Sequence, residues 1–388
     1  MKKKIKFLGV AVLVTAIVIG FAACDGGGNG GHTHDWQAID GGVAPTCTTP
    51  GSGKLKCTTC GEEKDGDTLA ALGHDYGNWT TTTRTLTVLE TRVCSHDPSH
   101  KETRGEIANS AQGVWINAGT FTMGSPESEP GRATNETQHS VTLTKGFYMG
   151  KYQVTQAQYE AVMGSNPSYY KTPVVPETNT DNRPVERVSW YDALVFCNKL
   201  SMLEELSPAY EMQTEANTAV WSADPATWGT VPTGSDTRWN AVRIAGDSDG
   251  YRLPTEAQWE YACRAGTETA FNDGETQDYS NTTAVNQLGW YSGNGNRTHG
   301  VGEKAANKWG LYDMHGNVFE WCWDWYNESY YSSSPTEDPA GAASGSDRVV
   351  RGGYYNFAAS LARSAFRFFI NPYNRDIAVG FRLVRPAQ

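Results

Sequence analysis

The sequence predicts a loop-rich α+β protein, and three observations support that prediction. Three short stretches each open with a capping Ser or Thr and then place apolar side chains on one face. Near the C-terminus, apolar residues alternate with arginines as they do in half-buried strands. The intervening stretches are rich in Gly, Pro, Asn and Ser, which cannot all join one sheet. With 388 residues, the chain is long enough for one large domain and a small one.

Three helices are predicted over residues 155–163, 189–203 and 255–263, each beginning at the hydroxyl residue that caps it. Pro254 precedes the third helix, and the Arg-Ala-Gly sequence that ends at Gly266 stops it. Periodicity is weak between these helices. Residues 207–250 are therefore interpreted as an insertion of loops and short strands, in which Trp221, Trp228 and Trp239 are expected to be packing anchors.

The C-terminal segment 351–382 combines a framework with an unusual centre. Its flanks carry the strand-like residues Val349, Val350, Phe381, Leu383 and Val384, and its bends carry Gly352, Gly353 and Gly380. Between the flanks, aromatic and aliphatic side chains alternate with Asn, Ser, Asp and Ala without a helical or strand period. An aperiodic loop with this much apolar surface is typical of a binding surface. The alternative is a loop buried in the core.

The residue types of this segment are also restricted. From Arg351 to Arg382 there is no Lys, Glu, Gln, Met or Trp, although all five occur elsewhere. A codon that ends in a pyrimidine encodes none of those five, yet such codons encode every residue type between Tyr354 and Ala378. Randomising the adenines of Asn codons would generate this set. The pattern therefore suggests a targeted, hypervariable surface.

Net charge and composition limit the partners. The formal net charge is −11 and the isoelectric point is about 5.3, which argues against nucleic acid or an anionic membrane as a partner. Abundant Gly, frequent Trp and Tyr, and modest charge suit an extracytoplasmic, loop-rich globular protein.

Residues 1–24 are predicted to be a targeting segment. Lysines near the start precede an apolar run from Phe7 to Ala22, and small residues stand directly before Cys24. This arrangement resembles a bacterial lipoprotein box in which Cys24 becomes the lipidated N-terminus and anchors the protein to the membrane. Residues 25–31, rich in Gly, are expected to be a flexible tether. The alternative is a plain N-terminal membrane anchor.

Residues 32–104 are predicted to form a small module built on a half-repeat, since the tripeptide at His34 recurs as His74-Asp-Tyr76. The Cys57-Thr-Thr-Cys60 turn supplies half of a tetrahedral zinc site. The candidate zinc ligands are Cys47, Cys57, Cys60 and His74, with Cys94 and further histidines as alternatives. Disulfides are the rival interpretation, because the chain carries the marks of export. No catalysis is expected in this module.

Five motifs appear in order after about residue 111. They are Phe121-Thr-Met-Gly-Ser125, Val141 to Thr155, Arg183-Pro-Val-Glu-Arg-Val-Ser-Trp-Tyr-Asp-Ala193, Tyr251 to Ala262, and Trp309-Gly-Leu-Tyr-Asp-Met-His-Gly-Asn-Val-Phe-Glu-Trp321, followed by the Arg-Gly-Gly and Gly-Phe-Arg ends of the C-terminal segment. This succession resembles the formylglycine-generating enzyme, or sulfatase-modifying factor, family over residues 111–388. The resemblance implies a C-type-lectin-like α+β fold.

The resemblance also implies an oxidase chemistry that this sequence does not support. Members of that family oxidise a substrate cysteine with two cysteines of their own, which hold copper(I) and lie within the C-terminal segment. Residues 351–382 contain no cysteine, and hydroxyl groups cannot replace thiolates as copper(I) ligands. Cys197 and Cys263 are expected to be inert buried thiols, and Cys322 lacks a positioned base.

A second group that shares this domain fits better: the chain resembles variable lipoproteins of diversity-generating retroelements. In that group, adenine-directed mutagenesis alters a C-terminal segment on a stiff lectin-like scaffold. Positions expected to be fixed scaffold are Arg363, Ser364, Ala365, Arg367, Pro372, Arg375, Gly380, Phe381 and Arg382. Positions expected to vary and to bind ligand are Tyr354, Tyr355, Asn356, Phe357, Ala358, Ser360, Leu361, Phe366, Phe368, Phe369, Ile370, Asn371, Tyr373, Asn374, Asp376, Ile377 and Ala378.

One metal site is implied by the family resemblance. Asp313 and Glu320 flank the carbonyls of Gly316 and Val318, a spacing similar to a calcium site of the family, with hard oxygen ligands throughout. No cofactor is required, and His315 is expected to be structural.

Three functional hypotheses follow. The first is a lipid-anchored receptor or adhesin on the outer surface of a bacterial cell, which binds a protein or glycan through residues 354–378 without catalysis. The second is an oxidoreductase of the formylglycine-generating type. The third is a structural lipoprotein of the cell envelope whose aromatic residues bury against a fixed partner.

Overall fold

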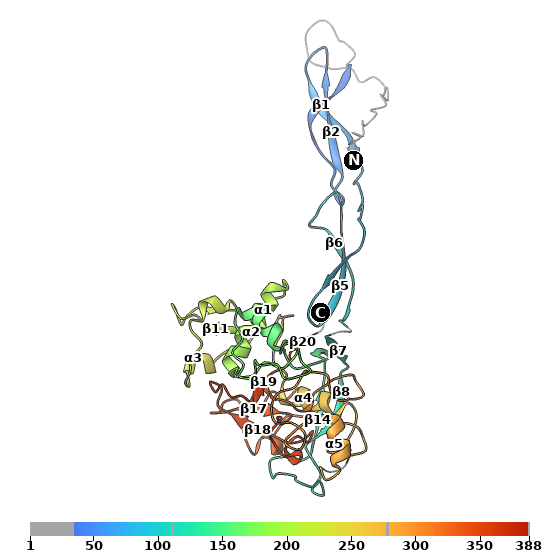
Figure 1. Cartoon of the computed structure of the whole chain (residues 1–388). Coiled ribbons are helices and arrows are strands. Elements are labelled where there is room, and N and C mark those ends of the chain that lie inside the picture. Colours follow the sequence, from blue (N-terminus) through green and yellow to red (C-terminus); the bar gives the residue numbers. More distant parts are fainter. Residues whose placement is uncertain (1–34, 110–111, 277–278, 387–388) are drawn as a thin grey trace. The chain divides into compact units, whose positions relative to one another are not determined.

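The computed structural model describes residues 35–109, 112–276 and 279–386 (Figure 1). The predicted targeting segment, the tether and Cys24 lie outside these residues. Two compact units emerge. We call the described residues up to Thr80, together with Thr91–Thr103, the N-terminal unit, and Thr81–Glu90 together with the chain from Arg104 onward the large unit.

The N-terminal unit is made of strands. β1 (Trp36–Val43), β2 (Gly51–Cys57) and β3 (Glu63–Leu69) form an antiparallel sheet in the order β1-β2-β3. β4 (Thr80–Thr83), β5 (Thr87–Val93) and β6 (Lys101–Ala108) form a further sheet in the order β4-β5-β6, and the residues of these strands within 81–90 and 104–108 belong to the large unit.

The boundary of the predicted module differs from the structure, because residues 81–90 belong to the large unit. Leu86 is 1% exposed and packs in the main hydrophobic core. The backbone N–H and the hydroxyl of Thr85 both donate to Glu204 Oε1, at 2.9 and 2.6 Å. Arg385 donates to Thr87 Oγ1 at 2.8 Å. These contacts join residues far apart in the chain, which a Thr-rich stretch does not reveal.

The large unit contains the three predicted helices and two that were not predicted. α1 (Gln156–Met163), α2 (Trp190–Leu203) and α4 (Glu256–Arg264) each begin with a capping box, formed by Thr155, Ser189 and Thr255 respectively. These predictions are confirmed. The remaining helices are α3 (Thr237–Asn240) and α5 (Thr282–Leu288), and the 3-10 turns are η1 (Pro225–Thr227), η2 (Tyr330–Ser332) and η3 (Ala359–Leu361).

Short strands complete the large unit. They are β7 (Gly113–Ile116), β8 (Gly119–Met123), β9 (His139–Leu143), β10 (Phe147–Gly150), β11 (Tyr210–Gln213), β12 (Trp221–Ser222), β13 (Arg243–Ile244), β14 (Gly289–Trp290), β15 (His315–Gly316), β16 (Phe319–Trp325), β17 (Arg348–Arg351), β18 (Phe368–Ile370), β19 (Val379–Gly380) and β20 (Val384–Pro386). The largest sheet has the order β18-β17-β16-β19, and its β16–β19 pair is parallel while its other pairs are antiparallel. Both ends of the C-terminal segment are thus paired in one sheet.

The core of the large unit differs from the predicted half-buried strands. Val349 and Val350 are fully buried, but so are the flanking Arg348 and Arg351. Alternation therefore does not separate a core face from a solvent face here, because buried acceptors compensate the arginines. Trp228 and Trp239 are buried in the core, as packing anchors are. Among the described residues, no helix is long and apolar enough to cross a membrane.

Candidate functional site

In the C-terminal segment, the positions expected to be fixed and those expected to vary differ in burial. Of the residues expected to be fixed, Arg375 alone is half-buried and the others are buried. Of the residues expected to vary, three are buried: Tyr355, Phe366 and Ala378, at 3%, 8% and 6% exposure. These three do not fit a freely accessible position, because Tyr355 hydrogen-bonds Tyr170 and the other two pack into the core. The remaining predicted positions are half-buried or exposed, with Phe369 at 41%.

Buried arginines hold the frame of this segment. Arg351 donates to the carbonyls of Ser364, Ala365 and Phe366 at 2.8, 3.0 and 2.6 Å, and it pairs with a Glu260 oxygen. Arg367 makes a two-pronged pair with Glu256, at 2.7 and 2.9 Å.

Arg363 makes a third anchor of this kind. It donates to both Glu136 oxygens, at 2.9 and 2.7 Å, to Gly131 O at 2.7 Å, and to Glu129. Paired guanidinium–carboxylate contacts of this geometry fix orientation as well as distance. The backbone between the exposed positions is therefore tied down at several buried points.

Aromatic side chains of the C-terminal segment pack around the buried Phe319 of β16. The Phe368 ring stacks on Phe319 at 5.3 Å with an 8° interplanar angle, and the Phe357 ring meets Phe319 edge-on at 5.3 Å. Tyr354 lies 4.4 Å from Phe357. We call the half-buried or exposed rings of Tyr354, Phe357, Phe368 and Phe369 the aromatic surface. These rings pack against one another and remain partly exposed, so a partner can contact them.

Three tyrosines that sequence reasoning missed extend the aromatic surface. Tyr170 meets Tyr355 edge-on at 5.4 Å, and the two hydroxyls are 2.9 Å apart. Tyr169, 59% exposed, packs against Tyr170 at 5.1 Å. Tyr326 stacks on Phe369 at 4.3 Å. The signal for Tyr169 was present: two adjacent tyrosines in a polar loop, Asn166-Pro-Ser-Tyr-Tyr170, have no periodic reason to be there.

The thiols of the large unit are enclosed. Cys197, Cys263 and Cys322 are each 0% exposed. Burial raises the pKa of the Cys263 thiol to about 12, and burial also raises the pKa values of the other two. A thiol that stays protonated in the interior is a poor nucleophile and a poor metal ligand.

The candidate calcium ligands converge on one point. The amide nitrogen of Gln153 lies 3.3 Å from Asp313 O, 3.3 Å from Gly316 O, 3.0 Å from Val318 O and 3.0 Å from Glu320 Oε1. Glu320 Oε1 also accepts from Arg382 at 2.7 Å, but an amide NH₂ has only two hydrogens, so the three carbonyl oxygens still outnumber the hydrogens of Gln153. Asp313 Oδ1 and Gln153 Oε1 are buried without a hydrogen-bond partner. Burial raises the pKa of Asp313 to about 6. A hard-oxygen cage with too few donors fits Ca²⁺.

Calcium is therefore expected to raise the melting temperature of chelator-treated protein. A ligand that binds only the folded state, at a hundred times its Kd, adds about 2.7 kcal/mol of stability. The measurement is thermal unfolding with added CaCl₂, with MgCl₂ at the same ionic strength as the control. Mg²⁺ demands stricter octahedral geometry and is expected to shift the melting temperature less. Equal shifts with both salts, or none, would refute a calcium site here.

The predicted zinc quartet of the N-terminal unit is not assembled as expected. Among the described residues, Cys47 and His74 are grouped with Cys94, with ligand atoms within 4.8 Å of one another, and neither candidate metal group includes Cys57 or Cys60. Cys57 and Cys60 belong to the first half-repeat, whereas Cys94 belongs to the second. Spacing along the sequence favoured the nearer Cys-x-x-Cys turn, whereas the fold brings Cys47 to the second half-repeat.

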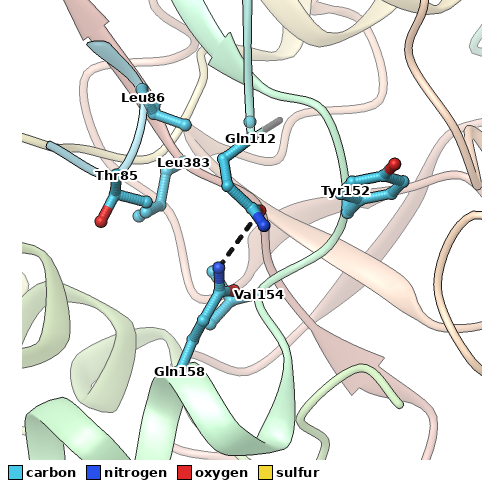
Figure 2. Close-up of a pocket in the computed structure, with 8 residues that line it drawn as sticks. Thr85, Leu86, Gln112, Tyr152, Val154, Gln158 and Leu383 are labelled. Atoms are coloured by element: carbon cyan, nitrogen blue, oxygen red, sulfur yellow. Dashed lines mark hydrogen bonds between the residues drawn. The ribbon is translucent and has the colours of Figure 1, made fainter. Parts of the chain in front are cut away.

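A small hollow elsewhere in the large unit contains none of the predicted ligand positions (Figure 2). It is lined by residues that include Leu86, Tyr152 and Leu383, and Gln158 donates to Gln112 across it at 3.4 Å. Its cavity volume is about 10 Å³, roughly the space that one water molecule needs, so this hollow is a poor candidate for a ligand site.

Comparison with protein-family models matches residues 99–387 to the sulfatase-modifying factor enzyme 1-like domain. The chain belongs to this family. Chaperone protein LppX of Paenibacillus barcinonensis is 37% identical to this chain over 206 residues, which are 48% of this chain and 65% of LppX. The chain thus covers less than two thirds of LppX. Formylglycine-generating enzyme of Mus musculus is 31% identical over 296 residues, which are 69% of this chain and 73% of that enzyme.

A solved structure of the family supports the predicted fold. Treponema denticola variable protein 1 aligns with a TM-score of 0.64 and 32% identity, over 80% of this chain and 100% of that chain. PvdO from Pseudomonas aeruginosa aligns with a TM-score of 0.51. The predicted loop-rich, C-type-lectin-like α+β fold is confirmed, and so is the resemblance to the sulfatase-modifying factor family and its variable proteins.

Proposed function

We propose that this chain is a ligand-binding protein without catalytic activity, a receptor or adhesin whose partner is chosen by a diversified C-terminal segment. The ligand is a protein or a glycan, bound by the aromatic surface and the exposed polar residues around it. Lipidated Cys24 anchors the protein in a bacterial cell envelope and displays it at the outer surface. The similarity to the variable protein of Treponema denticola supports this proposal.

One observation carries the proposal: apart from the buried Tyr355, Phe366 and Ala378, residue type and burial divide the segment in the same way. Framework residues such as Ser364, Ala365 and Arg367 are buried and held by hydrogen bonds or ion pairs. Asn356, Ala358, Phe369, Asn374 and Asp376 are exposed. Tyr and Phe offer large contact area at low entropic cost, while Asn and Asp adapt their hydrogen bonds to a partner.

Exchange of the exposed residues is therefore expected to leave stability almost unchanged. Substitutions at exposed positions usually change the free energy of unfolding by no more than about 0.5 kcal/mol. A library that randomises Asn356, Ala358, Asn374 and Asp376 should yield mostly soluble, folded variants. Ala365→Phe is the matched control, because overpacking a fully buried site costs roughly 1–3 kcal/mol. The measurement is the melting temperature of each variant. If substitutions at the exposed positions lower it as much as Ala365→Phe does, the division of the segment into a fixed frame and an exchangeable surface is wrong.

Diversification itself has a separate test. The genomic DNA beside the coding sequence is expected to contain a near-identical, adenine-rich copy of the segment that encodes residues 354–378, together with a reverse transcriptase gene. Sequencing the flanking DNA checks this directly. Absence of both elements would remove the diversification claim and would leave a fixed surface, as the structural-lipoprotein hypothesis requires.

The oxidase hypothesis has a specific family relative in its favour, the formylglycine-generating enzyme. The burial of Cys197, Cys263 and Cys322 opposes it, because a substrate peptide needs access to the reacting thiol. Incubation of the purified chain with copper(I) and a cysteine-type sulfatase peptide is expected to produce no aldehyde by mass spectrometry. Formation of aldehyde would establish catalysis and overturn the present proposal.

A further inference from the structure

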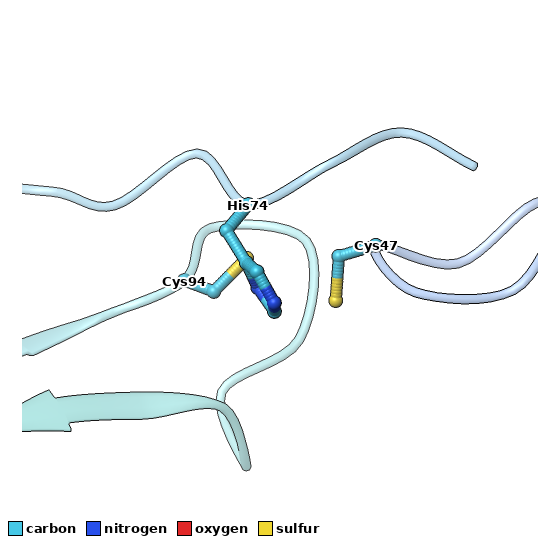
Figure 3. Close-up of side chains that lie close together, drawn as sticks. All are labelled: Cys47, His74 and Cys94. Atoms are coloured by element: carbon cyan, nitrogen blue, oxygen red, sulfur yellow. The ribbon is translucent and has the colours of Figure 1, made fainter.

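Four metal-binding side chains of the N-terminal unit come from three separate connections between strands. Cys47 lies between β1 and β2, His74 lies between β3 and β4, and Cys94 and His100 lie between β5 and β6. The Cys47, His74 and Cys94 ligand atoms all lie within 4.8 Å of one another. Figure 3 shows these three side chains close together. Cys47 and His100 belong to a second such group, with Asp97.

The contacts among these side chains point to one centre. Cys47 Sγ lies 2.7 Å from Nδ1 of His100. The Cys47 thiol also contacts the Cys94 thiol, which in turn hydrogen-bonds the His74 side chain. The His74 and His100 rings are 5.1 Å apart and nearly perpendicular, at 79°, so they approach from different directions. Two sulfurs and two imidazole nitrogens are a donor set typical of structural zinc.

His100, rather than Asp97, completes the set. Asp97 Oδ1 already accepts hydrogen bonds from the Ser99 N–H at 2.9 Å and the Ser99 hydroxyl at 2.7 Å. Asp97 Oδ2 is 3.8 Å from His100 Nδ1, which is beyond hydrogen-bond distance, whereas Cys47 Sγ lies 2.7 Å from that nitrogen.

A comparison of the two cysteine turns of the half-repeat, residues 57–62 and 94–100, shows how His100 is positioned. In the first turn, Thr58 N–H donates to Asp35 O at 2.9 Å, and Cys57 N–H donates to Glu62 O at 2.8 Å. In the second turn, Ser95 N–H donates to Asp75 O at 2.8 Å, and Cys94 N–H donates to His100 O at 2.9 Å. The two turns share this bonding, but the second is one residue longer and places an imidazole where the first has a glutamate.

The described side chains of the N-terminal unit form no hydrocarbon core, and we therefore expect this unit to need a cross-link. Among its described side chains, the buried hydrophobic ones are those of Cys47, Cys57 and Cys94. A unit of this size without buried Leu, Ile, Val or Phe does not bury enough apolar surface to offset the entropy of folding. In small domains of this kind, the free energy of metal binding supplies the free energy of folding.

We infer that Cys47, His74, Cys94 and His100 bind one Zn²⁺ and that this ion stabilises the N-terminal unit. Both thiols bind as thiolates, so each releases one proton to solvent when the zinc binds. The ion joins three strand connections that have few other buried contacts. This inference is independent of the function proposed for the large unit.

The test uses the whole chain, purified without chelator. Elemental analysis is expected to find one zinc per chain. X-ray absorption at the zinc edge is expected to show two sulfur donors at about 2.3 Å and two nitrogen donors at about 2.0 Å. Cys94→Ser and His100→Ala are expected to lower the retained zinc at least tenfold after dialysis against a competing chelator. Cys60→Ser, at an exposed cysteine outside the cluster, is the matched control and should retain the metal.

The number of sulfur donors to zinc is measured on the unaltered chain, so it tests the proposed ligand set even if a variant fails to fold. Three sulfur donors, or loss of zinc from Cys60→Ser, would assign the metal to the Cys57–Cys60 turn and overturn the proposed set. A zinc-free chain with a Cys47–Cys94 disulfide, found by peptide mass mapping, would replace the metal with a covalent staple. Zinc retained in full by Cys94→Ser would also refute the site.

Discussion

Replacing Arg363 with methionine is expected to destabilise the large unit by roughly 3–5 kcal/mol, because it leaves buried carboxylates without a partner. The Arg363 side chain is 0% exposed, and those of Glu136 and Glu129 are 0% and 4% exposed. Burial opposes ionisation of Glu136, but Arg363 more than offsets it and holds the pKa of Glu136 below its ordinary value. Without the guanidinium, burial would be opposed only by the hydrogen bonds from Ser125 and Ala133 at Glu136 and by the more distant charge of Arg264 at Glu129.

Urea unfolding followed by tryptophan fluorescence measures this loss as a lower midpoint with an unchanged slope. Arg375→Met is the matched control. Arg375 makes an equally two-pronged pair with Asp192, at 2.7 and 3.0 Å, but its side chain is 29% exposed. Pairs that water can reach contribute about 1 kcal/mol or less. Arg363→Lys should fall between the two, since it keeps the charge and loses the fork.

The pH dependence of Arg363→Met distinguishes unpaired charge from lost packing. As pH falls, the freed Glu136 and Glu129 take up protons and stop being buried charges. The gap in stability between the variant and the wild type is therefore expected to narrow in acid. A gap that stays constant with pH would show that packing, not charge, dominates at this position.

The sequence predicted those parts of the fold that local chemistry decides. The caps at Thr155, Ser189 and Thr255 depend on a side chain and a backbone N–H three residues apart, so a short window contains all of the information. The ordered motifs identified the family in the same way. The absence of cysteine from residues 351–382 was likewise readable without coordinates.

The remainder depended on contacts between distant residues. Arg351 was expected to face outward from a half-buried strand, and Arg363 was expected to be fixed scaffold with no partner named. Their partners Glu260, Glu136 and Glu129 lie between 91 and 234 residues away. No local pattern reveals such a pairing. The contact between Tyr170 and Tyr355 crosses 185 residues in the same way.

Acidification is expected to destabilise the large unit through His315. This histidine is 1% exposed; its Nδ1 lies 2.7 Å from Ala362 O, and its Nε2 accepts the Asn272 N–H at 3.2 Å. Those partners require a neutral ring that carries its proton on Nδ1. Burial lowers the pKa of His315 to about 4, from an ordinary value of 6.5, although the Ala362 carbonyl opposes the shift.

The direction in which stability changes with pH follows from comparing proton binding by the folded and unfolded states. Above pH 6.5 both the folded and the unfolded states hold a neutral ring, and the effect is absent. As pH falls from 6.5 to about 4, the unfolded state binds a proton that the folded state refuses, so stability is lost across that window. At about 1.4 kcal/mol per pKa unit, the loss approaches roughly 3 kcal/mol. This pH effect arises next to Arg363, because the His315 ring contacts Ala362, the residue directly before Arg363.

His315→Asn isolates this contribution, since an amide can still donate to Ala362 O but does not titrate. The comparison is needed because Asp324 opposes the trend: burial raises its pKa to about 7, which disfavours the folded state as pH rises. The variant is expected to be less stable than the wild type above pH 6.5, and the difference should shrink by up to roughly 3 kcal/mol as pH falls to 4. Urea midpoints measured across that range decide the matter. A difference that does not change with pH would mean that the pKa of His315 is the same in the folded and unfolded states, so that the buried ring takes up a proton as readily as an exposed one.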